Sequence, residues 1–242
     1  MPGRKKKKAL PNRQRRSRES TAFETVVVDA APPGRCGSGL SIAALLTATF
    51  VWSCSPMTGF DIWWHLKTGQ LIIERQTLPF VDWFTYSDSD AAWVDLHWGF
   101  QLLAAATYAT GGVPLLVLAK ATLITTTVAV GLFAGRTNFD RGLPVAIWSL
   151  VAVVLTGRGI VRPEILSLVF LATWLSILLR TDHRPNRLWL LPLMLILWVN
   201  CHALFVFGPV IFACWVVDAL IRQSADGRWG LTRRKDSPLH SR

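Results

Sequence analysis

FDIWWHLKTGQLIIERQTLPFVDWFTYSDSDAAWVDLHWGFQ, residues 60–101, is the stretch around which the chain is organised. It is rich in Trp, Asp and His, and long apolar runs lie on both sides of it. Apolar runs with few charges are typical of membrane-spanning helices, which need about 20 residues to cross a hydrocarbon core of about 30 Å. The sequence therefore predicts a helical membrane protein that holds this stretch at one face of a bilayer.

The charges of the chain are unevenly distributed. Of its 242 residues, 51% are hydrophobic and 17% charged, and the formal net charge is +11. The basic residues lie at both ends and in two short loops, whereas the Trp-rich stretch is acidic. Alternation of sign between loops is what the positive-inside rule produces. We therefore interpret the basic segments as topology signals near anionic lipid and expect no nucleic-acid partner.

The apolar runs predict the fold class, an all-α polytopic membrane protein. We expect six spans, at residues 39–55, 113–134, 144–156, 165–179, 188–199 and 203–221. Whether the segment 95–110 crosses the membrane decides the number of spans. If it is interfacial or re-entrant, there are six spans and the basic loops 135–143 and 180–187 face the cytoplasm; if it crosses, there are seven. The positive-inside rule favours six.

Three regions follow from this topology. Residues 1–37 are predicted to be a disordered, basic, cytoplasmic tail. Residues 38–221 form the membrane domain, whose first outer loop, 57–112, carries interfacial helices that begin near Asp61 and Asp95. Residues 222–242 form a charged cytoplasmic tail. The predicted location is the bacterial inner membrane, in a multi-pass arrangement.

The four cysteines show neither a CxxC pair nor a metal-ligand spacing. They are Cys36, Cys54, Cys201 and Cys214. We expect them to act mainly as small hydrophobic residues. A disulfide between Cys54 and Cys201 is the alternative, because both lie near the predicted outer face.

The six-span topology gathers polar side chains on the outer face. They are Asp61, His65, Asp95, His97, Arg158, Arg162, Glu164, Asn200 and His202. Ionisable groups at membrane depth are costly and usually mark a site or a pair. Simpler interpretations remain open: Asp61 as a helix cap, Arg162 paired with Glu164, and the histidines as interface residues. Trp63, Trp64 and Trp93 fit either a membrane belt or a sugar-stacking surface. The Asp88–Asp90 triplet is predicted to be a solvated turn.

Several motifs resemble a known family. They are DIWWHLKTG at 61–69, TLPFVDWFTYS at 77–87, WVDLHW at 93–98, RPE at 162–164 and WVNCH at 198–202. Together, over about residues 38–221, they resemble bacterial multi-pass membrane proteins similar to the glycosyltransferases of the C-type membrane fold, including lipid A and lipopolysaccharide sugar transferases. The resemblance implies that the chain corresponds to the N-terminal part of such an enzyme. It departs from the usual Asp/Glu-x-Asp pair, because position 63 is Trp.

The resemblance implies a reaction and roles for the candidate residues. A sugar passes from a polyprenyl-phosphate donor in the membrane to an acceptor at its outer face. Asp61, just after the first span, is the expected catalytic base, and Glu164 the second catalytic candidate. Arg158 and Arg162 would hold the phosphate leaving group. The expected substrate-binding residues are His65, Asp95, His97, Asn200, His202, Trp63, Trp64 and Trp93, and the histidines are also candidates for a divalent metal.

Two other functions compete with this one. The chain could be a non-catalytic membrane scaffold or a truncated relative, in which Asp61 matters only for folding. A transporter is the third alternative, but it should show polar residues in mid-span and an internal repeat. Here the polar groups cluster at one face.

Overall fold

The structure is a computed structural model that describes residues 35–233, except 89–90, 135–141, 158–159 and 182–184. The described part is all-helical, which confirms the expected all-α class; outside its helices it has one isolated antiparallel bridge, between Val81 and Ala92. The elements are α1 (Arg35–Ser53), α2 (Asp61–Arg75), α3 (Trp98–Ala134), α4 (Gly142–Thr156), α5 (Glu164–Leu179), η1 (Pro185–Arg187), α6 (Leu190–Val199), η2 (Ala203–Val206) and α7 (Phe207–Arg233).

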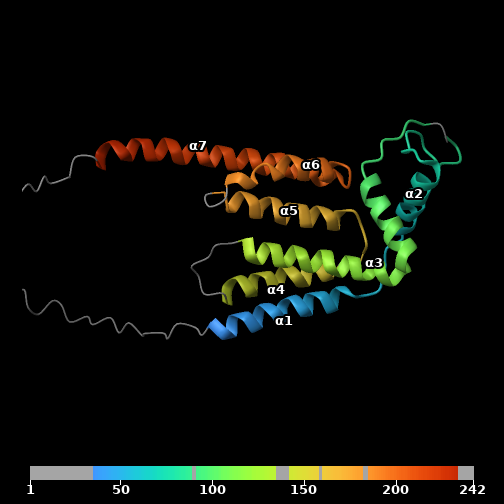
Figure 1. Cartoon of the computed structure of the whole chain (residues 1–242), viewed down its shortest axis with the longest axis horizontal. Helices are drawn as coiled ribbons and strands as arrows, with labels where there is room; N and C mark the ends of the chain where they lie inside the picture. The colour runs from blue at the N-terminus through green and yellow to red at the C-terminus, as the bar shows by residue number, and fades with distance from the viewer. Residues whose placement is uncertain (1–34, 89–90, 135–141, 158–159, 182–184, 234–242) are drawn as a thin grey trace, which may run out of the picture. The chain divides into compact units, whose positions relative to one another are not determined.

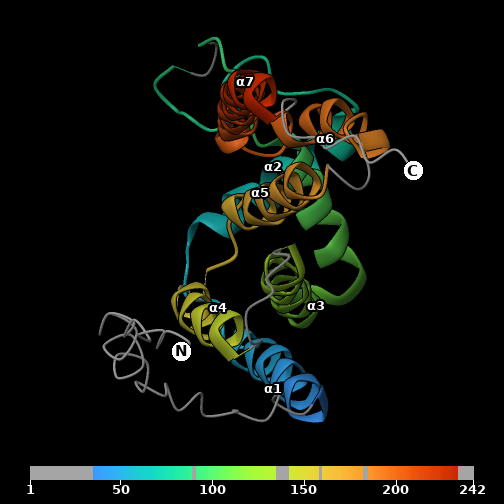
Figure 2. The ribbon, with the colours of Figure 1, turned by 90° about the vertical axis from the view of Figure 1, so that its left-hand side faces the viewer.

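The apolar helical segments run back and forth between two ends (Figure 1). Two helical segments, Trp98–Ala134 and Ala203–Arg222, are long and apolar enough to cross a membrane. Four others, from α1, α4, α5 and α6, are apolar but shorter than 18 residues. α3 packs against α1, α4 and α5, and α5 in turn contacts α6 and α7, as the end-on view shows (Figure 2).

α3 consists of two helices joined at a kink. Gly111 and Gly112 have non-helical backbone angles, and Gly112 has φ +60°, a conformation that glycine adopts without steric cost. The kink thus separates the predicted segment 95–110 from the predicted span 113–134. The part before the kink packs against α2 and turns away from the part after it (Figure 1).

The second predicted interfacial helix begins later than expected. Asp95 and His97 do not start it; they precede Trp98, the first residue of α3. The Asp95 Oδ1 atom accepts the backbone N–H of His97 at 2.8 Å. Such a local side-chain bond offers the backbone an alternative to the helix, which is why the helix starts after it.

A small core fixes α2 on the kinked helix. Its buried members come from α2, both parts of α3 and the segment before α5: Ile62, Leu66, Phe100, Ala104, Leu116 and Val161. Gly69 makes this close approach possible, because a Cβ atom there would clash with the Gln101 carbonyl oxygen and lie 2.8 Å from the Ala105 Cβ.

Both ends of the described chain extend beyond the expected spans. α1 begins at Arg35, before the apolar run, and α7 continues to Arg233, past the end of its apolar run at Ile221. At the end opposite to α2, the Arg180 guanidinium donates to the Phe133 carbonyl and so ties α5 to α3. Cys54, Cys201 and Cys214 are free thiols, so the disulfide alternative between Cys54 and Cys201 is wrong.

Replacing Gly69 with alanine is expected to destabilise the fold, because the added methyl meets helix backbone that cannot give way. Overpacking of this kind costs about 1–3 kcal/mol. Gly39→Ala is the matched control: Gly39 also lies in a helix, and nothing comes within 4 Å of its Cβ position. Thermal unfolding of the detergent-solubilised proteins should show a lower midpoint for Gly69→Ala alone. Equal midpoints for the two variants would contradict the close approach of α2 to α3.

Candidate functional site

The candidate residues lie at the end of the helices where α1 and α6 stop and α5 begins (Figure 1). Asp61 is the first residue of α2, and its Oδ2 atom is 2.5 Å from Nη2 of Arg162. The N-cap position of α2 is occupied by Phe60, not by Asp61. The capping interpretation of Asp61 and the pairing of Arg162 with Glu164 are therefore both replaced by this ion pair between distant segments.

Arg162 is held by the start of α5. Its carbonyl oxygen accepts the N–H of Ile165 at 3.1 Å, and the carbonyl of Pro163 accepts that of Leu166. Pro163 has φ −56°, which suits the entry of a helix. The Arg162 side chain is 41% exposed, yet its Nε atom is buried without a hydrogen-bond partner. The backbone is thus fixed, while the guanidinium is only partly satisfied.

Arg162 also lines an apolar groove of about 480 Å³. Both parts of α3 and the start of α5 form its walls. Leucine, isoleucine, valine, alanine and phenylalanine side chains make up most of the lining, and Arg162 and Lys120 are its charged members. A groove of this kind fits an apolar chain with an anionic group at the Arg162 end.

Lys120 lies in the apolar second part of α3, and only 2% of it is exposed. Its ammonium donates to the carbonyl oxygen of Ser55 at 2.9 Å and to the Ser55 hydroxyl at 3.3 Å. Ser55 lies two positions after Ser53, the last residue of α1, near the helix end where the dipole favours a cation. Lys120 therefore anchors the linker that leads from α1 to Asp61.

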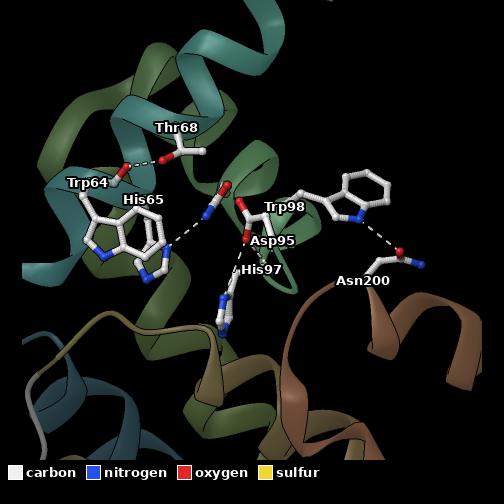
Figure 3. Close-up of polar contacts among 8 residues, drawn as sticks. Trp64, His65, Thr68, Asp95, His97, Trp98 and Asn200 are labelled. Atoms are coloured by element: carbon white, nitrogen blue, oxygen red, sulfur yellow. Dashed lines mark hydrogen bonds and ion pairs between the residues drawn. The ribbon is translucent and has the colours of Figure 1, made fainter. Parts of the chain in front are cut away.

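Three histidine rings from three segments lie next to one another. His65 comes from α2, His97 precedes α3, and His202 follows α6. The ring centroids of His65 and His97 are 5.8 Å apart, and those of His97 and His202 are 5.5 Å apart. His65 is 5% exposed and also contacts the rings of Trp64 and Phe100. Figure 3 shows His65 and His97 on facing segments.

These surroundings keep the imidazoles neutral at pH 7. Burial, followed by the neighbouring His97, lowers the pKa of His65 from 6.5 to about 4. Burial also lowers the pKa of His97, against the opposing effect of Asp95. Burial and His97 lower the pKa of His202, against the opposing effect of Glu164. The second predicted catalytic carboxylate, Glu164, is thus electrostatically coupled to His202.

Buried acceptors lie beside the histidines. The Asp95 side chain is 2% exposed, and its Oδ1 atom is 3.7 Å from Nδ1 of His97. The Gln101 side-chain nitrogen is 3.5 Å from Nδ1 of His65. The second carboxylate oxygen of Asp95 and the amide oxygen of Gln101 are buried without a partner among the described residues. Two unpaired buried acceptors can receive hydrogen bonds from a hydroxyl-bearing ligand or from water.

His202 belongs to a second polar chain. The Ser167 hydroxyl accepts the indole N–H of Trp198 at 2.8 Å and lies 2.9 Å from Nδ1 of His202. With the imidazole neutral, the hydroxyl can donate its own proton to that nitrogen. Ser167 is therefore the link between α5 and the turn after α6.

Asn200 holds the start of α3. Its Oδ1 atom accepts the indole N–H of Trp98 at 3.0 Å, and its backbone carbonyl accepts the N–H of Gly99 at 2.8 Å. The Gly99 N–H is one of the first backbone donors of α3, which the helix cannot satisfy internally. The geometry assigns Asn200 a positioning task, which Figure 3 shows for its side chain.

The predicted Trp residues lie on exposed surface. Trp63 is 49% exposed and meets the ring of Tyr108 edge-on, and Trp64 is 37% exposed. Trp93 is 43% exposed and donates its backbone N–H to Phe80 in a small hairpin. The turn of this hairpin is shaped by Asp82, whose carboxylate accepts two backbone N–H groups and the Thr85 hydroxyl.

The structure brings most predicted residues together and adds new ones. Arg158, Ser89 and Asp90 lie outside the described residues. Asp88 is exposed, as expected of a solvated turn. Gln101, Ser167 and Lys120 had no assigned role. The signal that could have found them was a polar residue inside an apolar helical run, which is costly unless paired.

The predicted metal site has no complete ligand set in the described part of the chain. Within residues 35–233 and outside the gaps, no group of three or more His, Cys, Asp and Glu side chains is placed to hold a metal ion.

No family model, curated protein or solved structure matches the chain. The resemblance of the motifs to membrane glycosyltransferases stays a prediction, and the functional argument depends on the geometry of the site.

The stability of the protein is expected to fall as the pH falls from 6.5 to 4. In this window an unfolded histidine binds a proton, whereas folded His65, with a pKa of about 4, does not. The loss from His65 amounts to about 3 kcal/mol at the lower end. Thermal unfolding between pH 7.5 and 4.5 measures it. In His65→Gln, which stays neutral, the decrease should be smaller; an unchanged pH dependence would contradict the burial of this imidazole.

Proposed function

We propose that the chain is the lipid-binding, membrane-embedded part of a glycosyltransferase-like protein that takes a sugar from a polyprenyl-phosphate donor at the outer face of the bacterial inner membrane. The observation that supports this proposal is that Arg162, which is paired with Asp61, also lines an apolar groove. An apolar chain, an anionic group and a carboxylate would meet at this point.

The groove suits the donor lipid. Its lining is mostly apolar over about 480 Å³, which is enough for part of a prenyl chain whose remainder lies in the bilayer. At the end of the groove, the Arg162 guanidinium offers parallel N–H groups that match two phosphate oxygens. Arg158 would add a second cation to this clamp.

In the proposed reaction these residues have the following roles. The acceptor hydroxyl oxygen attacks the anomeric carbon of the sugar while the bond from this carbon to the phosphate oxygen breaks. The electron pair of the broken bond stays on the phosphate, where Arg162 stabilises the charge. The hydroxyl proton passes to the carboxylate of Asp61, which acts as general base.

The histidine cluster would bind the acceptor. Neutral imidazoles both donate and accept hydrogen bonds, and the unpaired oxygens of Asp95 and Gln101 accept them. Sugar hydroxyls are matching partners. The exposed indoles of Trp63 and Trp64, next to this cluster on α2, provide apolar faces for a sugar ring or a prenyl chain.

This function requires the six-span topology, in which the loop 57–112 faces outside and the loops 135–143 and 180–187 face the cytoplasm. In a variant without the native cysteines, a Cys at Tyr86, which is fully exposed, should react with an impermeant maleimide from outside. A Cys at Asn186, between α5 and α6, should react only after the membrane is opened. Labelling of the Asn186 position in intact cells would contradict six spans and favour seven.

The catalytic assignment predicts that Asp61→Asn lowers sugar transfer about a hundredfold, as loss of a general base typically does. Arg162→Gln should lower it through donor binding and leaving-group stabilisation. The measurement is the transfer of labelled sugar from lipid-linked donors in a membrane extract, normalised to folded protein. Asp88→Asn, a change at an exposed position outside the site, is the control and should retain full transfer.

The scaffold alternative makes a different prediction for the same variants. If Asp61 served only to hold α2 against α5, its loss would lower the amount of folded protein and leave the transfer per molecule unchanged. Full turnover by Asp61→Asn would therefore end the assignment of Asp61 as the base.

A further inference from the structure

Asp61 and Arg162 form an ion pair with each other. In the proposed reaction, however, Asp61 must accept a proton from the acceptor hydroxyl and Arg162 must bind the donor phosphate. Their side chains are 47% and 41% exposed, so solvent and ligands can reach both. While the pair is closed, its charges cancel toward an incoming phosphate, and the Oδ2 atom of Asp61 is engaged. While the ion pair is closed, the site therefore neither attracts a phosphate nor offers a free carboxylate as a base.

We propose that the phosphate of a prenyl-phosphate lipid displaces Asp61 from Arg162, so that binding of the donor itself releases the catalytic carboxylate. This inference rests on the proposed function. Arg162 lines the groove in which the lipid would lie, and Asp61 stands at the same guanidinium from the side of α2. The Arg162 guanidinium thus has two competing anionic partners: the Asp61 carboxylate and the phosphate of the bound lipid.

The guanidinium has the capacity for this exchange. It carries five N–H donors. Its contact with Asp61 is made through Nη2, and its Nε atom is buried without a hydrogen-bond partner in the described part of the chain. The two non-bridging oxygens of the donor phosphate, or two of the three free oxygens of a prenyl phosphate, can engage two of these donors at once, whereas the present contact with the carboxylate joins one pair of atoms.

The exchange is also inexpensive. Half-exposed ion pairs of this kind change an equilibrium by only about two- to fivefold. The Arg162 backbone is fixed by the first turn of α5, and Asp61 by the first turn of α2. The two side chains can therefore part by rotation, without movement of either helix. The released carboxylate would stay beside the phosphate end of the groove, where the acceptor hydroxyl must arrive.

The exchange predicts that removal of the competing charge improves lipid binding. The test uses the full chain in phosphatidylcholine nanodiscs with undecaprenyl phosphate as the probe. Asp61→Asn should bind it about fivefold more tightly than the wild type, because the guanidinium is no longer neutralised. Asp61→Glu, which keeps the carboxylate, should bind like the wild type. Undecaprenol and inorganic phosphate, each offering half of the ligand, should bind weakly to all variants.

Two further variants separate the failure of this inference from that of the proposed function. Arg162→Gln should weaken binding at least tenfold, and Arg75→Gln, a change of an exposed arginine on α2, should not. If Arg162→Gln binds normally, the proposed phosphate site is wrong. If Arg162→Gln loses binding but Asp61→Asn binds no more tightly than the wild type, the site stands and the exchange is overturned.

The wild-type protein offers an independent measurement that does not depend on the folding of a variant. Modification by a water-soluble carbodiimide and an amine, followed by mass spectrometry, reports the accessibility of single carboxylates. Relative to exposed Glu74 on the same helix, Asp61 should become at least twofold more reactive when undecaprenyl phosphate is added, and should not change with undecaprenol. A constant ratio with both lipids would overturn the exchange.

Discussion

The ion pair between Asp61 and Arg162 is the interaction on which the site depends. It joins the first turn of α2 to the segment that enters α5, and so connects the stretch 60–101 to the other helices. As a source of stability it is minor, because half-exposed pairs contribute about 0–1 kcal/mol. Its weakness is what suits it to function. A strong buried pair would not open at low cost. This half-exposed pair keeps both charges near the groove, and each side chain can still bind another partner.

The sequence was sufficient to predict where the helices lie and which end carries the polar groups. Apolar runs mark the helices, and Gly111 with Gly112 marks the break in α3, because few other residues accept such a backbone. The sign of the loop charges predicted Asp61, Arg162 and His202 on one face, and in the structure Asp61 pairs with Arg162 while His65, one turn after Asp61, is electrostatically coupled to His202. These signals are local, so each can be recognised without knowing how the helices pack.

The partners of the site residues could not be predicted, because they depend on the packing of helices far apart in sequence. The sequence offered Glu164 as the natural neighbour of Arg162, two positions away; the structure chooses Asp61 instead. The start of α3 was missed for a smaller reason, the local bond from the His97 backbone to Asp95. Lys120 interrupts an apolar run visibly, but only the packing of α3 on α1 shows that its partner is Ser55.

The lengths of the short apolar helices determine how deep the site would lie in a bilayer. α4 has 15 residues and α5 has 16, which corresponds to a length of about 22–24 Å at 1.5 Å per residue. This is less than the hydrocarbon thickness of about 30 Å. In a bilayer, helices of this length either thin the membrane or end below its surface. Thinning would bring Arg162, at the start of α5, to the level where the phosphate of the proposed donor lies. A short α5 would thus allow the phosphate to reach the guanidinium while its prenyl chain remains in the bilayer.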